Sequence, residues 1–254
     1  MNIRKGILLL AVFAALVPGS AGTLFAYRPL GTEDAGVAGK GVAQLELSWD
    51  YVRWDGNDRD YVLTAVPVYG ITERAELSAE IPYVMHRSGI QPLVEGGGDV
   101  NMVMKYLVMP ENGEHPAFTV KGVVKLDSGD HTQGLGSGDR DYSVFAVSTK
   151  TLGVVSIHGH LGYTWIGKSN DPNLRNIYLY GLALDYGITD ALHIVGELDG
   201  NRYPYLQAIQ DPRIALLGMT LKFSDRFTVD VGIRKGLTAT APEWSTTAGV
   251  SMTY

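Results

Sequence analysis

Residues 44–54, QLELSWDYVRW, alternate apolar and polar side chains. Leu45, Leu47, Trp49 and Tyr51 take the odd positions, whereas Gln, Glu, Ser and Asp take the even ones. Successive side chains of a β-strand point to opposite faces of the sheet. The stretch therefore predicts a strand with one apolar face and one polar face.

The same alternation recurs through to the C-terminal WSTTAGVSMTY, residues 244–254. Clusters of Gly, Pro, Asn and Asp separate the alternating segments, as expected of turns and loops. Most segments reach the roughly 9 to 11 residues that a tilted membrane strand needs. The pattern predicts about twelve strands, at residues 41–54, 60–70, 74–86, 98–110, 115–127, 139–151, 153–167, 174–188, 190–201, 211–223, 225–237 and 244–254.

The connectors alternate between short turns and longer loops rich in Gly, Asp, Asn and Pro. One motif recurs at the short turns: YGITERAEL at 69–77, YGITDALHI at 186–194 and, more loosely, KFSDRFTVDVGI at 222–233. An even strand number with tight turns at one end is typical of an all-β, antiparallel, up-and-down outer-membrane barrel. We expect periplasmic turns and extracellular loops, with the aromatic residue of each motif in the interfacial girdle.

The first 26 residues indicate the compartment. A basic MNIRK, an apolar GILLLAVFAALV and a small-residue PGSAG form a secretory signal peptide, cleaved after Ala21 or Ala26. The chain of 254 residues has a net charge of −6 and no cysteine, which argues against a disulfide-stabilised extracellular domain. We expect a signal peptide at 1–26, a periplasmic or lumenal segment at 27–40 and the barrel at 41–254.

A soluble β-sandwich or a lipocalin-like barrel would also alternate, but it would bury its apolar face inward. Strand length, the near-absence of helical periodicity and the terminal aromatic Tyr254 favour the membrane barrel. We therefore expect the protein in the bacterial outer membrane, in contact with its lipid. The C-terminal strand ending at Tyr254 is expected to contact the barrel-assembly machinery.

Six ordered segments carry a family resemblance: YRPLGTEDAGVAGKGVAQLELSWDY, AVPVYGITERAELSAEIPY, GGGDVNMVMKY, VKLDSGDHTQGLGSGDRDYSV, HGHLGYTWIG and GITDALHIVGEL. Together they resemble the outer-membrane "transporter" family labelled as the putative MetA pathway of phenol degradation. Family members often have Lys-Leu-Pro-Thr-Gly where this chain has KLDSG at 125–129. The resemblance implies an outer-membrane barrel that passes small aromatic or hydrophobic molecules.

If the apolar faces point to lipid, the charged side chains point into the lumen. There they either form an ion-pair lattice that fills a narrow interior or line a wet path that sets selectivity. The acidic excess disfavours acidic oligosaccharides and is compatible with neutral or cationic solutes. The expected lumen-lining residues are Glu46, Asp50, Glu76, Glu80, Lys105, Lys121, Lys125, His158, His160, Asp185, His193, Glu197, Asp199, Asp230 and Arg234.

The glycine-rich loop at 127–141 is the expected constriction, through Asp127, Asp130, Asp139 and Asp141. Its acids do not match a calcium-binding EF-hand, and its GLGSG lacks the Gly-Lys-Ser/Thr ending of a phosphate loop. His158 and His160 are expected to be hydrogen-bonding lumenal residues. We expect no metal, no cofactor and no nucleic-acid partner.

Catalysis is not expected, because the chain has no Gly-x-Ser-x-Gly elbow and its strand histidines fall on polar faces. Residues 27–40 are long enough to enter the lumen, where Arg28, Glu33 and Asp34 could find partners. The sequence thus favours passive or facilitated passage of a small solute. The alternative is a non-conducting barrel, closed by charge, that serves a structural or docking role.

Overall fold

The computed structural model describes residues 28–89, 92–168, 171–208 and 210–254. The expected signal peptide and its two cleavage points lie outside these residues. The strands are β1 Ala43–Arg53, β2 Arg59–Thr72, β3 Ala75–Arg87, β4 Val94–Gly97, β5 Asn101–Met109, β6 Ala117–Lys125, β7 Asp141–Leu152, β8 Val155–Trp165, β9 Ile177–Gly187, β10 Leu192–Asn201, β11 Arg213–Ser224, β12 Phe227–Gly236 and β13 Trp244–Thr253. Two 3₁₀ turns, η1 Asp55–Asn57 and η2 His131–Gln133, lie in loops. Among the described residues, no helix is long and apolar enough to cross a membrane.

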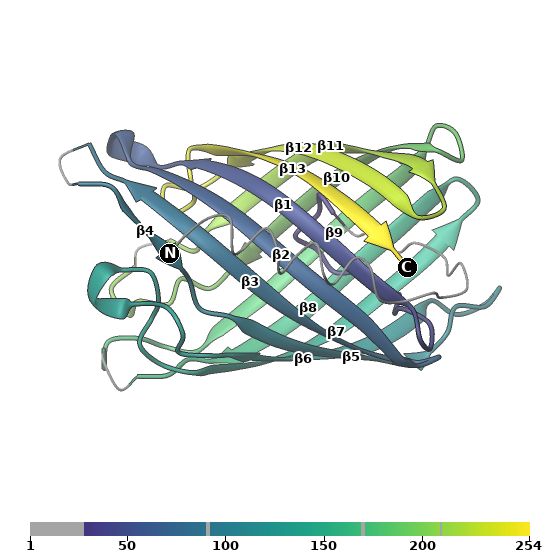
Figure 1. The fold of residues 1–254 in the computed structure, drawn as a ribbon, viewed down its shortest axis with the longest axis horizontal. Helices are drawn as coiled ribbons and strands as arrows, with labels where there is room; N and C mark the ends of the chain where they lie inside the picture. The colour runs from purple at the N-terminus through teal and green to yellow at the C-terminus, as the bar shows by residue number, and fades with distance from the viewer. Residues whose placement is uncertain (1–27, 90–91, 169–170, 209) are drawn as a thin grey trace.

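The strands form one antiparallel sheet that closes on itself through pairing of β1 with β13 (Figure 1). Strand β3 pairs with β4 along its second half and with β5 along its first half. Strands β4 and β5 therefore share one place in the ring, and the fold is a closed barrel of 12 strands, as the sequence predicts. The sequence predicts one strand at 98–110, which corresponds to β5, and it does not predict β4. Residues 98–100 separate β4 from β5.

The apolar faces point outward. Leu161 and Leu217 are 69% and 61% exposed, whereas Lys105 is 1% and Glu46 3% exposed on the opposite face. In water this arrangement would expose large apolar patches, but against lipid it removes apolar side chains from water and keeps polar groups inside. The polar members of the alternation therefore surround the barrel interior.

The turns at one end, the short-turn end, are tight. Strands β2 and β3, β7 and β8, and β11 and β12 are joined by residues 73–74, 153–154 and 225–226. The repeated motif forms three of the connections at this end, and its aromatic residues Tyr69, Tyr186 and Phe223 are exposed on the outer face. The connector at 110–116, between β5 and β6, is also at this end and is longer. The long-loop end includes the loops at 126–140 and 237–243.

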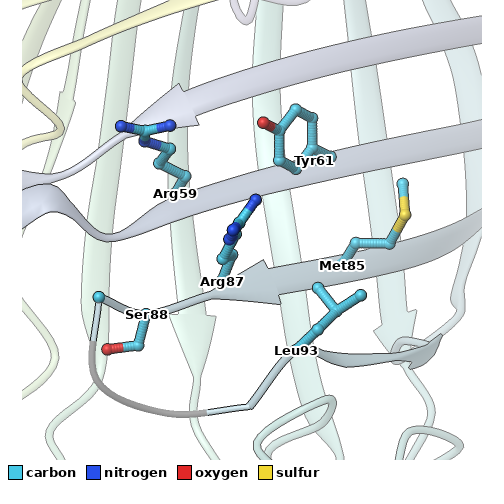
Figure 2. A pocket seen from close by; sticks show the side chains of 7 residues that line it. Arg59, Tyr61, Met85, Arg87, Ser88 and Leu93 are labelled. Carbon is cyan, nitrogen blue, oxygen red and sulfur yellow. The ribbon is translucent and has the colours of Figure 1, made fainter.

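The outer face near the long-loop end carries aromatic rings on β1, β2 and β13. The ring centroids of Tyr51 lie 5.2 Å from Tyr61 and 5.1 Å from Trp244. A groove of about 860 Å³ lies between β2, β3 and the start of β4. Tyr61, Arg59 and Arg87 are among the residues that line it (Figure 2). The aromatic cluster marks where the lipid-facing band of the barrel ends.

Candidate functional site

Residues 28–42, here called the N-terminal segment, lie inside the barrel although none of them belongs to a strand. The segment enters past Gly70 on β2, whose carbonyl accepts a hydrogen bond from the Gly41 N–H at 2.9 Å. Gly41 has φ +80°, which favours glycine. A Cβ at Gly70 would overlap the backbone of Ala38 and Gly39. Two glycines therefore allow the chain to turn from β1 into the lumen.

Inward-facing side chains of the wall hold the main chain of the segment. Each contact satisfies a backbone group that would otherwise be buried without a partner. The contacts are Ala38 N–H to Glu76 (2.5 Å), Ala35 N–H to Thr149 (2.9 Å), Thr119 O–H to the Ala35 carbonyl (2.6 Å), Glu33 N–H to His160 Nδ1 (3.1 Å) and Thr32 N–H to Glu197 (2.5 Å).

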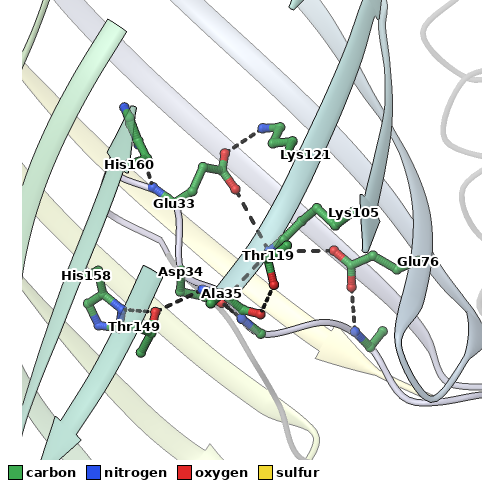
Figure 3. Close-up of polar contacts among 12 residues, drawn as sticks. Glu33, Asp34, Ala35, Glu76, Lys105, Thr119, Lys121, Thr149, His158 and His160 are labelled. Atoms are coloured by element: carbon green, nitrogen blue, oxygen red, sulfur yellow. Dashed lines mark hydrogen bonds and ion pairs between the residues drawn. The ribbon is translucent and has the colours of Figure 1, made fainter. Parts of the chain in front are cut away.

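Two wall lysines bind the acidic part of the segment (Figure 3). The Glu33 carboxylate lies 2.5 Å from Lys121 Nζ and 3.9 Å from Lys105 Nζ, and Asp34 lies 3.8 Å from Lys105. Glu76 on β3 also lies 3.8 Å from Lys105. Burial makes an unpaired charge costly, so the segment and the wall neutralise each other.

The basic part of the segment contacts the opposite wall. Arg28 pairs with Asp230 on β12 at 3.5 Å and donates to Thr247 on β13. Arg234 donates to the Pro29 carbonyl at 2.9 Å and pairs with Asp50 at 3.0 Å. Lys121 lies on β6 and Asp230 lies on β12. These two strands are six places apart in a ring of 12 strands, so they lie on opposite sides of the barrel. The segment therefore crosses the lumen, with its acids on the side of Lys121 and its Arg28 on the side of Asp230.

The loop at 126–140, here called the mouth loop, is anchored on Asp99, a residue that the sequence did not single out. Its carboxylate accepts backbone N–H groups of Gly129 at 2.9 Å and Ser137 at 2.8 Å, and lies 3.4 Å from Lys125. Burial raises the pKa of Asp99, but these N–H groups and Lys125 outweigh it and hold the pKa below its usual value. Asp99 follows a GGG run, and this signal could have marked it as a loop anchor.

The predicted lumen residues face inward to different depths. Glu46, Glu76, Lys105, Lys121, His158, His160, Glu197 and Asp230 are buried. Asp50, Glu80, Lys125, Asp185, His193, Asp199 and Arg234 are partly buried. The histidines have separate partners, since His158 contacts Thr149 at 3.0 Å whereas His193 contacts Asp185 at 2.6 Å. Their part in a solute path stays a prediction.

The four loop acids do not gather. Asp127 and Asp130 are exposed, whereas Asp139 and Asp141 are partly buried. Asp130 caps η2 by accepting the Thr132 N–H at 3.0 Å, and Asp141 pairs with Lys125 at 2.8 Å. Across the described ranges, no group of three or more histidines and acids has the arrangement of a metal site. The constriction role of these acids also stays a prediction.

A polar cavity of about 330 Å³ lies between the N-terminal segment and the short-turn end. Arg28 and Asp34 line it from the segment, and His158, Asp185 and Lys222 line it from the wall. On this side of the segment, the lumen therefore contains a space bordered by polar side chains.

Comparison with solved structures shows the fold. The chain is similar to the COG4313 outer membrane channel from Pseudomonas putida F1, with a TM-score of 0.69 and 12% identity over 90% of this chain and 100% of that chain. It is also similar to the KdgM porin in complex with disordered oligogalacturonate, with a TM-score of 0.53 and 11% identity over 82% of this chain and 98% of that chain. No curated protein matches the sequence significantly.

The closed barrel, its apolar outer belt and these neighbours place the protein in the bacterial outer membrane, with short periplasmic turns and longer extracellular loops. The family model described as "Putative MetA-pathway of phenol degradation" matches residues 26–254. The match covers the described barrel and the segment inside it. The chain thus belongs to this outer-membrane family, as its ordered motifs predict.

Proposed function

We propose that the protein is a passive outer-membrane channel for a small solute, and that its N-terminal segment is a plug that controls passage. The observation that carries the proposal is the course of the segment across the lumen between Lys121 and Asp230. Hydrogen bonds and ion pairs hold it, and each can be exchanged for water without breaking strand pairing. The similarity to an outer-membrane channel supports the same conclusion.

The proposed solute is a small neutral molecule with a polar group, of the size and kind of phenol. The family description names phenol degradation. The lumen wall carries both cationic hydrogen-bond donors and anionic hydrogen-bond acceptors. A hydroxyl group could replace one of the wall contacts of the segment, whereas an acidic oligosaccharide would meet the carboxylates of Glu46, Glu197 and Asp230. The predicted lumen-lining residues would provide the path.

Planar-bilayer recording tests the proposal. Deletion of residues 27–39 should raise single-channel conductance, because it removes the part of the N-terminal segment that crosses the lumen and leaves every strand in place. Glu114→Gln, in an exposed turn, is the matched control and should leave conductance unchanged. Phenol should reduce the current of the deletion variant by partial block.

The competing function is a non-conducting docking barrel, which the dense charge lattice at mid-height favours. If the deletion variant folds, shows heat-modifiable mobility and still carries no current, the channel proposal is wrong. A current that phenol does not reduce would support the channel proposal and contradict the proposed solute.

A further inference from the structure

We propose that the outer face of the extracellular rim binds the phosphate groups of a phosphorylated glycolipid of the outer leaflet. The site consists of an arginine row, Arg53, Arg59 and Arg87, and the groove beside it. The inference goes beyond the proposed channel and depends on different residues.

The sheet register places the three arginines side by side. Arg53 is opposite Arg59 in the β1–β2 pair, and Arg59 is opposite Arg87 in the β2–β3 pair. All three lie on the outward face, in line with Tyr51, Tyr61 and the other lipid-facing residues of their strands. Like charges directly across a strand pair repel, so a bound anion would relieve the repulsion.

Three acids lie near the arginine row. Glu243 lies 3.0 Å from Arg53, and the Asp58 carboxylate accepts the Gly89 N–H at 3.3 Å. Glu95 is opposite Met85 in the β3–β4 pair. The described residues that line the groove include two arginines and no carboxylate, which leaves the groove basic.

The height of the row matches that of lipid headgroups. The aromatic cluster of Trp49, Tyr51, Tyr61 and Trp244 lies on β1, β2 and β13. Trp49, Tyr51 and Tyr61 lie on the membrane side of the arginines, and Trp244 is opposite Arg53. Such aromatic girdles sit at the membrane interface, so the next outward residues toward the loops lie at the level of headgroup phosphates.

The groove has the polarity of an amphipathic ligand. Arg59, Arg87 and Ser88 form its polar part, and Tyr61, Met85 and Leu93 form its apolar part (Figure 2). Its volume of about 860 Å³ admits a phosphorylated sugar and the start of an acyl chain. The planar guanidinium groups can each bind a phosphate through two hydrogen bonds. The apolar part favours a lipid over a free anion.

Titration of the purified, folded full-length protein with lipid A in neutral detergent, followed by native mass spectrometry, tests the site. The double variant Arg59→Gln/Arg87→Gln should bind bisphosphorylated lipid A about tenfold more weakly than the unmodified protein, since two charge-assisted contacts are lost. The matched control is Arg74→Gln/Arg226→Gln, in two exposed periplasmic turns, and it should bind normally. Heat-modifiable mobility verifies that each variant is folded.

The lipid source is tested by competition. Inorganic phosphate at millimolar concentration should not displace lipid A, and dephosphorylated lipid A should bind the unmodified protein as weakly as the double variant binds the phosphorylated form. Equal binding by both double variants, equal binding of the dephosphorylated lipid, or full displacement by inorganic phosphate would each overturn the proposal. If the double variant does not fold, Arg59→Lys and Arg87→Lys retain the charge but lose the planar geometry, and each should weaken binding.

Discussion

At the scale of single residues, the interior depends on pairing each buried charge. Lys121 has an 8% exposed side chain and contacts Glu33 at 2.5 Å and Glu80 at 3.6 Å. Breaking one buried pair leaves a charge with neither water nor a counter-ion, which costs far more than breaking an exposed pair.

Lys121→Met should therefore reduce the free energy of unfolding by about 3–5 kcal/mol, because Glu33 and Glu80 lose their shared cation. Lys150→Met is the control, since Lys150 pairs with Glu111 at 3.3 Å in a more exposed setting, and it should cost about 1 kcal/mol or less. Guanidinium unfolding in detergent, followed by tryptophan fluorescence, measures both. Equal losses would show that the interior is better hydrated than the contacts indicate.

Gly70→Ala tests the entrance of the N-terminal segment. The new methyl group would overlap the backbone of Ala38 and Gly39, so the segment should be displaced and conductance should rise toward that of the deletion variant. Gly122→Ala is the control, because a Cβ at Gly122 meets no atom within 4 Å. Wild-type conductance in the Gly70 variant would mean that the N-terminal segment shifts slightly and still occupies the lumen.

At the scale of elements, the mouth loop is ordered by one carboxylate from outside it. Asp99 lies between β4 and β5 and binds backbone groups on both sides of η2. The loop has little apolar burial beyond Leu135, so its order depends on these polar contacts.

The lowered pKa of Asp99 gives the mouth loop a pH dependence. The stabilisation is complete above the ordinary value of 3.8 and is lost as the pH falls through the lower folded-state pKa. A spin label on His131→Cys, unique because the chain has no cysteine, should become more mobile in that acid range. Asp99→Asn should make the label mobile at every pH.

Asp130, whose hydrogen bonds from Thr132 and Gln133 also lower its pKa, could produce an acid transition of its own. An Asp99→Asn variant that kept the full pH step would assign the step to Asp130 and contradict the anchoring role of Asp99.

The strands were predictable because each alternates over many residues, and a lipid-facing strand must keep that alternation. The short β4 was not, because Val94–Gly97 is brief and glycine-rich and its pairing depends on the second half of β3. The inward orientation of the Lys105 and Lys121 side chains was predictable from the same alternation. Their partners were not, because Glu33 and Asp34 belong to a segment without strand periodicity.

At the scale of the whole molecule, the barrel has its apolar surface outside, and the depth of each residue in the membrane sets the cost of a charge there. Leu161 lies in the middle of β8, whereas Leu237 follows the extracellular end of β12, and both are exposed to the surroundings. The contact of the C-terminal strand ending at Tyr254 with the assembly machinery stays a prediction.

Leu161→Arg should reduce stability by about 2–4 kcal/mol, because it places a cation near the bilayer midplane, and Leu237→Arg should cost about 0–1 kcal/mol near the interface. Folding equilibria in phospholipid vesicles measure both. Equal costs in vesicles would contradict the assignment of the membrane band to the middle of the strands.

The opposed walls that hold the N-terminal segment have a consequence for anything that replaces it. With the segment withdrawn, Lys105 would keep Glu76, and Lys121 would keep Glu80. Arg234 would keep Asp50, whereas Asp230 would lose Arg28. These wall charges would set up a local electric field in the lumen. Such a field aligns the dipoles of water and of any polar molecule in transit. An apolar molecule of equal size would have to disrupt that aligned water without compensation, so the empty barrel would sort molecules by dipole moment as well as by diameter.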